Sequence, residues 1–225
     1  MSWIPFIVAA YVLGSIPFGV LIARSKGVDI TSHGSGNIGA TNVGRVLGRR
    51  FGLVCFALDM AKGAAPVLAA GAWHGDLGSP ATQIESVDMW LWLAVAAAAL
   101  IGHMASIFLR FRGGKGVATA FGALLAVWPT LGIPALVALG VWILIMATVR
   151  IVSIASMIAA VSLPISVALL MQLDSNGQDL QSGIVAARST PPLAIAGLIA
   201  VLVLVRHRSN IARLLKGREQ RVGRS

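Results

Sequence analysis

The feature that most constrains this chain is a series of apolar runs, most of them long enough to cross a lipid bilayer as a helix. One crossing of a hydrocarbon core ~30 Å thick takes about 20 apolar residues. Only 12% of the 225 residues are charged, whereas a soluble domain carries about 25%. We therefore expect an all-α polytopic membrane protein. The predicted spans lie in the runs 3–23, 51–73, 89–108, 117–149, 151–173 and 191–205.

The uncharged run 117–149 is too long for a single crossing. As one helix it would measure about 50 Å at ~1.5 Å per residue. Pro129 and Pro134 lie near its middle, where a proline interrupts helical hydrogen bonding. We read the run as a hairpin of two helices, which gives seven transmembrane helices in all.

The basic residues predict the orientation. With seven spans and the N-terminus outside, the inside segments 24–50, 109–116, Arg150 and the tail from Arg206 carry five, three, one and seven of the 18 Lys and Arg. If 117–149 crossed once, the split would be nine inside and eight outside. The positive-inside rule favours seven spans with a cytoplasmic C-terminus. The formal charge of +10 then reports topology, and no nucleic acid is expected as a partner.

The few polar or reactive residues inside the predicted spans are mostly expected to have structural roles. Cys55 is the one cysteine, which excludes an internal disulfide, and its apolar surroundings predict a small buried hydrophobe. Asp59 and Lys62 stand three residues apart, a spacing that favours an ion pair. His103 fits helix packing and a site role equally well. No spacing typical of metal ligands is seen, and no metal or cofactor is expected.

Three polar segments adjoin the inside ends of the predicted spans: residues 33–45, 102–119 and 207–219. Each combines glycines or amides with cations, a composition typical of an anion site, because glycine lets backbone N–H groups approach an oxyanion closely. Lys115 offers a compact charge and Arg45 a bidentate fork. The alternative is that the glycines only form turns and the cations only follow the positive-inside rule. Three such segments on one face favour the anion site.

Known phosphate and nucleophile motifs do not explain these segments. Residues 34–39 match G-x-G-x-x-G, but that fingerprint requires a preceding strand, and membrane spans flank it here. Residues 113–116 lack the Ser or Thr that ends a P-loop. Ser35 could act as a nucleophile with His207 or His33 as base, or donate a hydrogen bond to phosphate. We prefer the hydrogen-bond donor, because no Ser-His-acid order is discernible.

Taken together, the three segments resemble the bacterial membrane glycerol-3-phosphate acyltransferases that use acyl phosphate, the PlsY family. The matching pieces are SGNIGATNVGR at 35–45, GHMASIFLRFRGGKGVAT at 102–119 and HRSNIARLLKGRE at 207–219, with DMAKG at 59–63 and RIVSIAS at 150–156. The resemblance covers essentially the whole chain. It implies a single integral membrane acyltransferase domain over residues 1–225, in the bacterial inner membrane, with the active site on the cytoplasmic face.

The resemblance implies transfer of a fatty acyl group from acyl phosphate to the 1-hydroxyl of sn-glycerol 3-phosphate. The products are 1-acyl-sn-glycerol 3-phosphate and phosphate, in the first step of phospholipid synthesis. Expected partners are the two substrates, membrane lipids and, as a further candidate, the enzyme that makes acyl phosphate. The alternative is a phosphate-ester or anion transporter, but we see no internal repeat, and the motifs lie at span ends rather than at the midplane.

The resemblance also implies which residues form the site. Lys115 and Arg45 would offset the repulsion between two anionic substrates, and Ser35 or Asn210 would stabilise the oxyanion. Either His207 or the substrate's own phosphate would act as base. The expected catalytic residues are Ser35, Arg45, Lys115, His207 and Asn210, and the expected substrate-binding residues are Asn37, Gly113, Gly114, Gly116 and Ser153.

Overall fold

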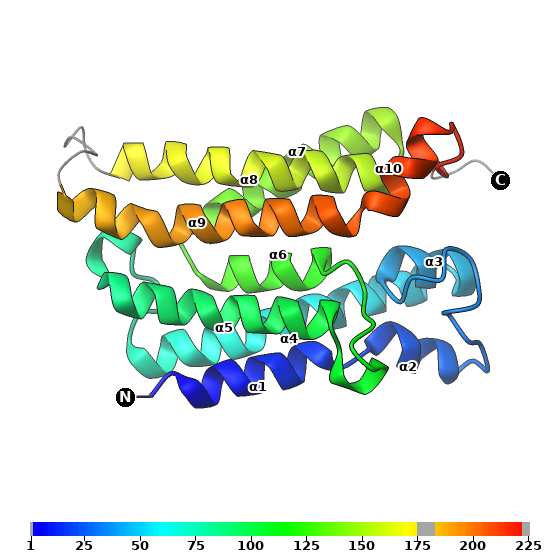
Figure 1. Cartoon of the computed structure of the whole chain (residues 1–225), viewed down its shortest axis with the longest axis horizontal. Helices are drawn as coiled ribbons and strands as arrows, with labels where there is room; N and C mark the ends of the chain where they lie inside the picture. Colours follow the sequence, from blue (N-terminus) through cyan, green and yellow to red (C-terminus); the bar gives the residue numbers. More distant parts are fainter. Residues whose placement is uncertain (1, 175–182, 222–225) are drawn as a thin grey trace. The chain divides into compact units, whose positions relative to one another are not determined.

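The computed structural model describes residues 2–174 and 183–221, and these residues are helical without a strand. They form ten α-helices and two short 3-10 turns, labelled in chain order (Figure 1). The chain divides into two compact units, one of Met1–Leu77 and Ala94–Val127, the other of Gly78–Leu93 and Trp128–Ser225. The prediction of an all-α membrane protein is confirmed. The division describes packing and leaves the prediction of one domain over 1–225 untested.

The first apolar run is interrupted by a proline. Helix α1 (Ile4–Ser15) ends at Ile16, whose ψ of 118° is extended, and α2 (Phe18–Arg24) follows Pro17. The break has a steric cause, because a proline disfavours helical geometry in the residue before it. The predicted span 3–23 is therefore confirmed in extent, as Ile4–Arg24, but it consists of two helices.

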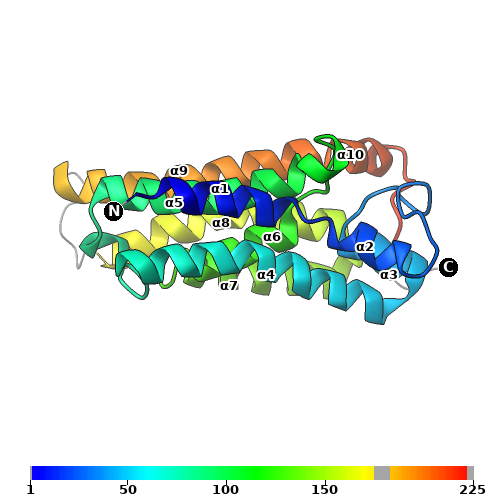
Figure 2. The same ribbon diagram turned by 90° about the horizontal axis from the view of Figure 1, so that it is seen from below.

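The next spans follow the hydropathy pattern closely. Helix α4 (Arg49–His74) covers the predicted run 51–73 and stops at Gly75, which has a left-handed φ of 82°. Helix α5 (Ser86–Met104) and the turn η2 (Ile107–Leu109) cover the predicted run 89–108. The short helix α3 (Ala40–Leu47) precedes α4, and Figure 2 shows α2 and α3 beside the N-terminal end of α4.

The prediction of seven transmembrane helices is wrong in one element. The run 117–149 is broken near its prolines, as expected, into α6 (Val117–Ala126) and α7 (Gly132–Val149). However, the ten residues of α6 extend only about 15 Å at ~1.5 Å per residue, half of a ~30 Å hydrocarbon core. Six helices in the described residues are long and apolar enough to cross a membrane, and α6 is a shorter apolar helix.

The second unit contains α7, α8 (Val152–Asp174), α9 (Gly183–Arg206), α10 (Arg208–Leu215) and the turn η1 (Ala81–Gln83). Helix α8 packs against both α7 and α9. The predicted run 191–205 is shorter than α9. The prediction began at Pro191 because prolines are typical of helix starts, whereas Pro191 and Pro192 lie inside α9, which begins at Gly183. Helix α10 was not predicted.

Glycines bring the helices of the first unit into close contact. A methyl group at Gly63 of α4 would lie 2.1 Å from the Thr119 carbonyl oxygen of α6, and one at Gly122 would lie 2.0 Å from the Met60 carbonyl oxygen. Small residues of this kind allow membrane helices to approach backbone to backbone. Helix α6 is therefore held along α4, with most of its side chains buried.

Candidate functional site

The loop before α3 is organised by the amide of Asn42, which is buried. Its Oδ1 accepts the Ser35 N–H at 2.8 Å, and its Nδ2 donates to the carbonyl oxygens of His33 at 3.0 Å and Asn37 at 2.8 Å. Gly34 adopts a left-handed φ of 60°, and a methyl group there would lie 2.3 Å from the Asn42 Oδ1. The first polar segment is thus a built loop, closed around one side chain.

The predicted residues of this loop have different surroundings. Ser35 is exposed, so its hydroxyl is open to solvent, while its backbone is fixed by Asn42. Asn37 is half-buried, and its Oδ1 accepts the Gly39 N–H at 2.9 Å at the start of α3. Arg45 lies exposed in the last turn of α3. Ser35 and Arg45 are therefore accessible, whereas the side-chain oxygen of Asn37 already accepts the N–H of Gly39, the residue before α3.

The glycines of the second segment pack directly on His103. The Gly114 N–H donates to the His103 carbonyl oxygen at 3.2 Å. A methyl group at Gly113 would lie 2.0 Å from that carbonyl oxygen, and one at Gly114 would lie 2.2 Å from the ring Nε2 of His103. Only glycine fits at these two positions. The half-buried Lys115 follows at once, two residues before α6 begins.

His103 belongs to a buried charged cluster. Its Nδ1 lies 3.6 Å from Asp59 Oδ1, and the Lys62 Nζ lies 2.8 Å from the same oxygen. Lys62 also donates to the Ile16 carbonyl oxygen at 2.6 Å, at the break between α1 and α2. The predicted Asp59–Lys62 ion pair is confirmed, as is the burial of Cys55. The contacts of His103 agree with the packing role that was one of its two predicted alternatives, and the role in the site stays a prediction.

In the second unit, Glu219 gathers two of the predicted site residues. Its Oε1 accepts hydrogen bonds from Ser153 Oγ at 2.8 Å and Asn210 Nδ2 at 2.5 Å, and its Oε2 accepts one from Arg213 Nε at 2.7 Å. Ser153 and Asn210 are buried. Burial opposes ionisation of Glu219, but the three hydrogen bonds outweigh it and hold the pKa of Glu219 below its usual value.

His207 is buried at the junction of α9 and α10. Its Nδ1 lies 2.7 Å from the Val203 carbonyl oxygen. A carbonyl oxygen only accepts, so Nδ1 must carry the proton in this contact, and in the neutral ring Nε2 then keeps its lone pair. The ring is oriented and has the tautomer that a general base or hydrogen-bond acceptor needs.

Sequence reasoning missed the residues that position the others. Asn42 lies inside a recognised polar segment but was not singled out, and a buried amide surrounded by glycines is the signal that identifies it. Glu219 lies at the end of the third polar segment and was not singled out either. Its spacing of nine residues from Asn210 gives no helical signal, because α10 ends between them.

The described residues suit anion chemistry. The first unit offers Ser35, Arg45 and Lys115 on loops and a short helix, and Lys115 stands within the glycine segment. The second offers an oriented imidazole next to buried amide and hydroxyl groups. In the described residues no group of three or more His, Cys, Asp and Glu side chains is placed to hold a metal ion.

Comparison with known proteins gives concordant results. A family model described as glycerol-3-phosphate acyltransferase matches residues 4–217. The glycerol-3-phosphate acyltransferase of Geobacter sulfurreducens is 44% identical over 214 residues, which cover 94% of this chain and 93% of the relative.

The structure is also similar to crystal structures of PlsY (YgiH), an integral membrane glycerol 3-phosphate acyltransferase. The glycerol 3-phosphate form matches with a TM-score of 0.81 and the lysophosphatidic acid form with 0.78. Both are 38% identical in sequence, and each match covers 99% of this chain and 96% of the other.

We predict that Glu219→Gln lowers stability at neutral pH and that the difference from wild type narrows in acid. A carboxylate whose pKa is lowered by folding stabilises the protein above its unfolded pKa of about 4.3. That contribution is lost as the pH falls through the folded pKa. Midpoints of thermal unfolding at pH 7.5 and about pH 4 measure the effect. Glu85→Gln, at an exposed position, serves as the control and should change neither midpoint. An equal difference in thermal midpoint between Glu219→Gln and wild type at both pH values would contradict a stabilising role of the Glu219 carboxylate.

Proposed function

The chain belongs to the glycerol-3-phosphate acyltransferase family, and from this premise we propose that its acyl donor is acyl phosphate. The reaction then transfers a fatty acyl group to the 1-hydroxyl of sn-glycerol 3-phosphate and gives 1-acyl-sn-glycerol 3-phosphate and inorganic phosphate. The observation that carries the proposal is the family match over residues 4–217, together with the glycine segment fixed beside Lys115. The transporter alternative is not favoured, since the relatives are enzymes.

The glycine segment suits the phosphate of glycerol 3-phosphate. Gly113, Gly114 and Gly116 leave their backbone without side chains, and Gly116 has a left-handed φ of 80° that turns the chain into α6. Backbone N–H groups in such turns, with the cation of Lys115 among them, bind anions. The Gly114 N–H already donates to the His103 carbonyl oxygen, so Gly114 contributes the close approach of its backbone rather than a donor. We assign Lys115 and these glycines to glycerol 3-phosphate binding.

The remaining predicted residues receive roles from their surroundings. Exposed Arg45 is suited to a bidentate contact with a phosphate, and the Ser35 hydroxyl to hydrogen bonding an oxyanion. The Asn37 side chain stays a substrate-binding residue in this proposal only through its Nδ2, because its Oδ1 already accepts the Gly39 N–H. Ser153 and Asn210 are engaged by Glu219, so we expect them to support the site by fixing α10.

The chemistry asks little of the protein, because acyl phosphate is already an activated mixed anhydride. The 1-hydroxyl oxygen attacks the acyl carbonyl carbon, a tetrahedral oxyanion forms, and the bond from carbon to the phosphate oxygen breaks as phosphate leaves. His207, through Nε2, accepts the hydroxyl proton, for which its orientation by Val203 is suited. The phosphate of the substrate is the competing base. Positioning of the two reactants contributes much of the rate.

We further propose that the protein lies in the bacterial inner membrane with its N-terminus outside and its active site and C-terminus in the cytoplasm. The distribution of Lys and Arg supports this orientation. With the two termini on opposite sides, the chain must cross the membrane an odd number of times. Because six helices of the described residues are long enough to cross, α6 and the nonhelical residues beside it must together form the seventh crossing. Irregular backbone is tolerated at membrane depth where protein buries it, and Gly114, Gly116 and Val127 are buried.

The orientation predicts opposite labelling of two introduced cysteines. In a Cys55→Ser background, Ser79→Cys should react with an impermeant maleimide in intact cells, whereas Ser209→Cys should react only after lysis. Ser182, a second position expected outside, lies beyond the described residues. Labelling of positions 79 and 209 from the same side would contradict the proposed topology.

Lys115→Ala should lower kcat/KM for glycerol 3-phosphate about 10- to 100-fold. A hydrogen bond to a charged group contributes about 1.5–3 kcal/mol, and each 1.36 kcal/mol corresponds to a tenfold change in rate. Steady-state kinetics in detergent micelles measure the effect. The elution volume in size-exclusion chromatography and the thermal midpoint show whether the variant is folded. Lys216→Ala removes an equal charge from an exposed position and should leave the kinetics unchanged. Wild-type kinetics in Lys115→Ala would remove support for this placement.

We expect direct transfer without a covalent acyl-enzyme. Protein incubated with labelled acyl phosphate alone should retain no acyl group, and both substrates should have to bind before phosphate is released. Ser35→Ala should be impaired, because a hydrogen-bond donor to the oxyanion is lost, whereas Cys55→Ser should stay active. Ping-pong kinetics, or stoichiometric acylation of Ser35 detected by mass spectrometry, would favour a covalent route instead.

A further inference from the structure

We propose that the turn Ile107–Arg112, together with Arg24, binds the headgroup of an anionic phospholipid at the membrane surface. This turn belongs to neither the glycine segment nor the loop around Asn42. Its features are exposed aromatic side chains, cations that take part in none of the salt bridges of the described residues, a strained backbone and an adjacent apolar groove. All of these residues lie in the first compact unit.

The ends of two spans line one groove beside this turn. The first candidate span ends at Arg24, and the span that contains α5 ends at Leu109. Both ends line one groove of about 290 Å³, whose other lining residues are apolar and include Ile16, Val20, Leu21 and Phe108. Because transmembrane segments end where hydrocarbon gives way to headgroups, the turn and Arg24 lie at the membrane–water boundary.

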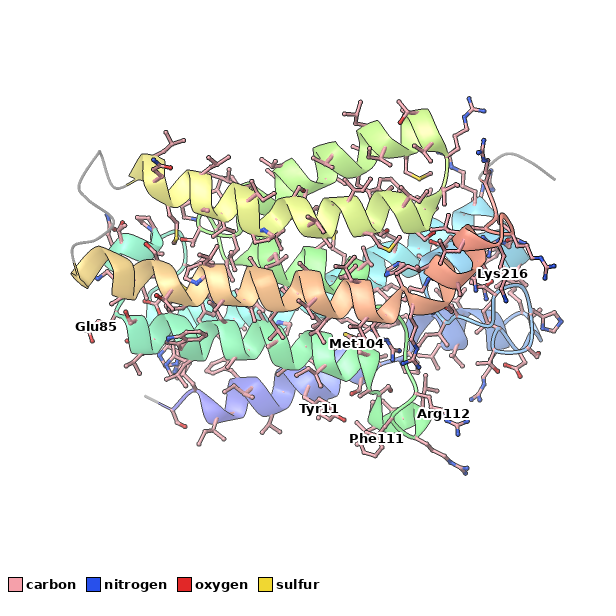
Figure 3. The ribbon with its side chains drawn as sticks, turned by 45° about the horizontal axis from the view of Figure 1, so that its top comes forward. Tyr11, Glu85, Met104, Phe111, Arg112 and Lys216 are labelled. Atoms are coloured by element: carbon pink, nitrogen blue, oxygen red, sulfur yellow. The ribbon has the colours of Figure 1, made fainter. Side chains whose placement is uncertain are left out.

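The side chains of the turn point outward. Phe108 is 56% and Phe111 69% exposed, and Arg110 and Arg112 are exposed beside them. Figure 3 shows Phe111 and Arg112 projecting from the end of this part of the chain. Phenylalanines and arginines exposed at a span end are suited to a membrane interface, since the apolar ring enters the boundary between headgroups and acyl chains and the guanidinium extends toward water and phosphate.

The backbone holds these side chains out at some energetic cost. Arg110 and Phe111 have φ values of 51° and 61°, a left-handed conformation that is a genuine outlier for a bulky residue. The turn persists because Ser106 fixes it. The Ser106 carbonyl oxygen accepts the Phe111 N–H at 2.8 Å, and its Oγ donates to the Ser15 carbonyl oxygen at 2.5 Å. Strain that surrounding contacts maintain in this way marks a conformation with a function.

The charge pattern selects an anionic lipid. None of the salt bridges in the described part of the chain involves Arg24, Arg110 or Arg112. Asp29 is already bound by Thr31, whose hydroxyl donates to it at 2.7 Å. Its pKa is lowered chiefly by the hydrogen bonds from Thr31 and, more weakly, by Arg24. Basic clusters at a membrane surface attract anionic lipids at about 1 kcal/mol per cation in general.

A lipid explains the groove better than a free anion does. The groove is lined by one cation, Arg24, and otherwise by apolar residues, the last of which, Leu109, directly precedes Arg110 in the turn. An inorganic phosphate would satisfy the cations and leave this surface unused. A phospholipid places its phosphate at the arginines and the upper part of an acyl chain along Phe108 and Leu21.

The test uses the full chain purified in detergent. We expect dioleoylphosphatidylglycerol to raise the thermal midpoint by about 2–5 °C more than dioleoylphosphatidylcholine, as for a ligand present well above its dissociation constant. Native mass spectrometry should show retained phosphatidylglycerol. Arg110→Gln/Arg112→Gln should abolish the difference between the two lipids and reduce the retained anionic lipid.

The matched control is Lys216→Gln/Arg218→Gln, which removes the same charge from exposed positions of the second unit and should keep the lipid difference. Phe111→Asn guards against a folding failure, because Asn tolerates a left-handed φ. This variant should be at least as stable without lipid, yet retain less phosphatidylglycerol.

Three results would overturn the proposal. The two lipids could raise the thermal midpoint equally, or both double variants could lose the difference between the lipids to the same extent. Inorganic phosphate could also raise the midpoint as much as phosphatidylglycerol does. The readouts are stability and bound lipid, so they are independent of the acyl donor.

Discussion

The first unit depends on the buried carboxylate of Asp59. A charge in a membrane helix is costly unless it is paired, and Asp59 lies 2.8 Å from the Lys62 ammonium and 3.6 Å from His103. Each partner links the pair to another element. Lys62 reaches the carbonyl oxygen freed where Pro17 breaks the first span, and His103 lies beneath the glycine segment. One ion pair thus connects α4, the α1–α2 break and the loop before α6.

Glu219 has a corresponding function in the second unit. It joins the start of α8, through Ser153, to α10, through Asn210 and Arg213. A carboxylate that accepts three hydrogen bonds is stabilised in its charged form, and it fixes α10 directly after His207. In both units, therefore, a carboxylate outside the predicted site holds the elements on which the site residues lie.

The sequence predicted the fold where a physical signal is local. Length and charge located the spans. Pro17 and Pro129 mark real breaks, although only the second was recognised, whereas Pro134 lies in the first turn of α7. The short α6 was overestimated because hydropathy measures apolar length rather than helix length. The start of α9 was missed because Pro191 and Pro192 lie inside it. Asn42, His103 and Glu219 act through contacts that are distant in sequence or irregular in spacing, and no periodicity reveals these.

The glycines of residues 113–116 have a double constraint that affects how substitutions there are interpreted. The composition indicates an anion-binding loop, but Gly113 and Gly114 are also required by their contact with His103. An alanine at either position would displace the loop or the imidazole, and through it the ion pair with Asp59. Loss of activity in such a variant would thus report packing as well as phosphate binding. Lys115 is free of this ambiguity in one respect, since removing its ammonium group changes the charge of the loop without adding a Cβ against the histidine ring.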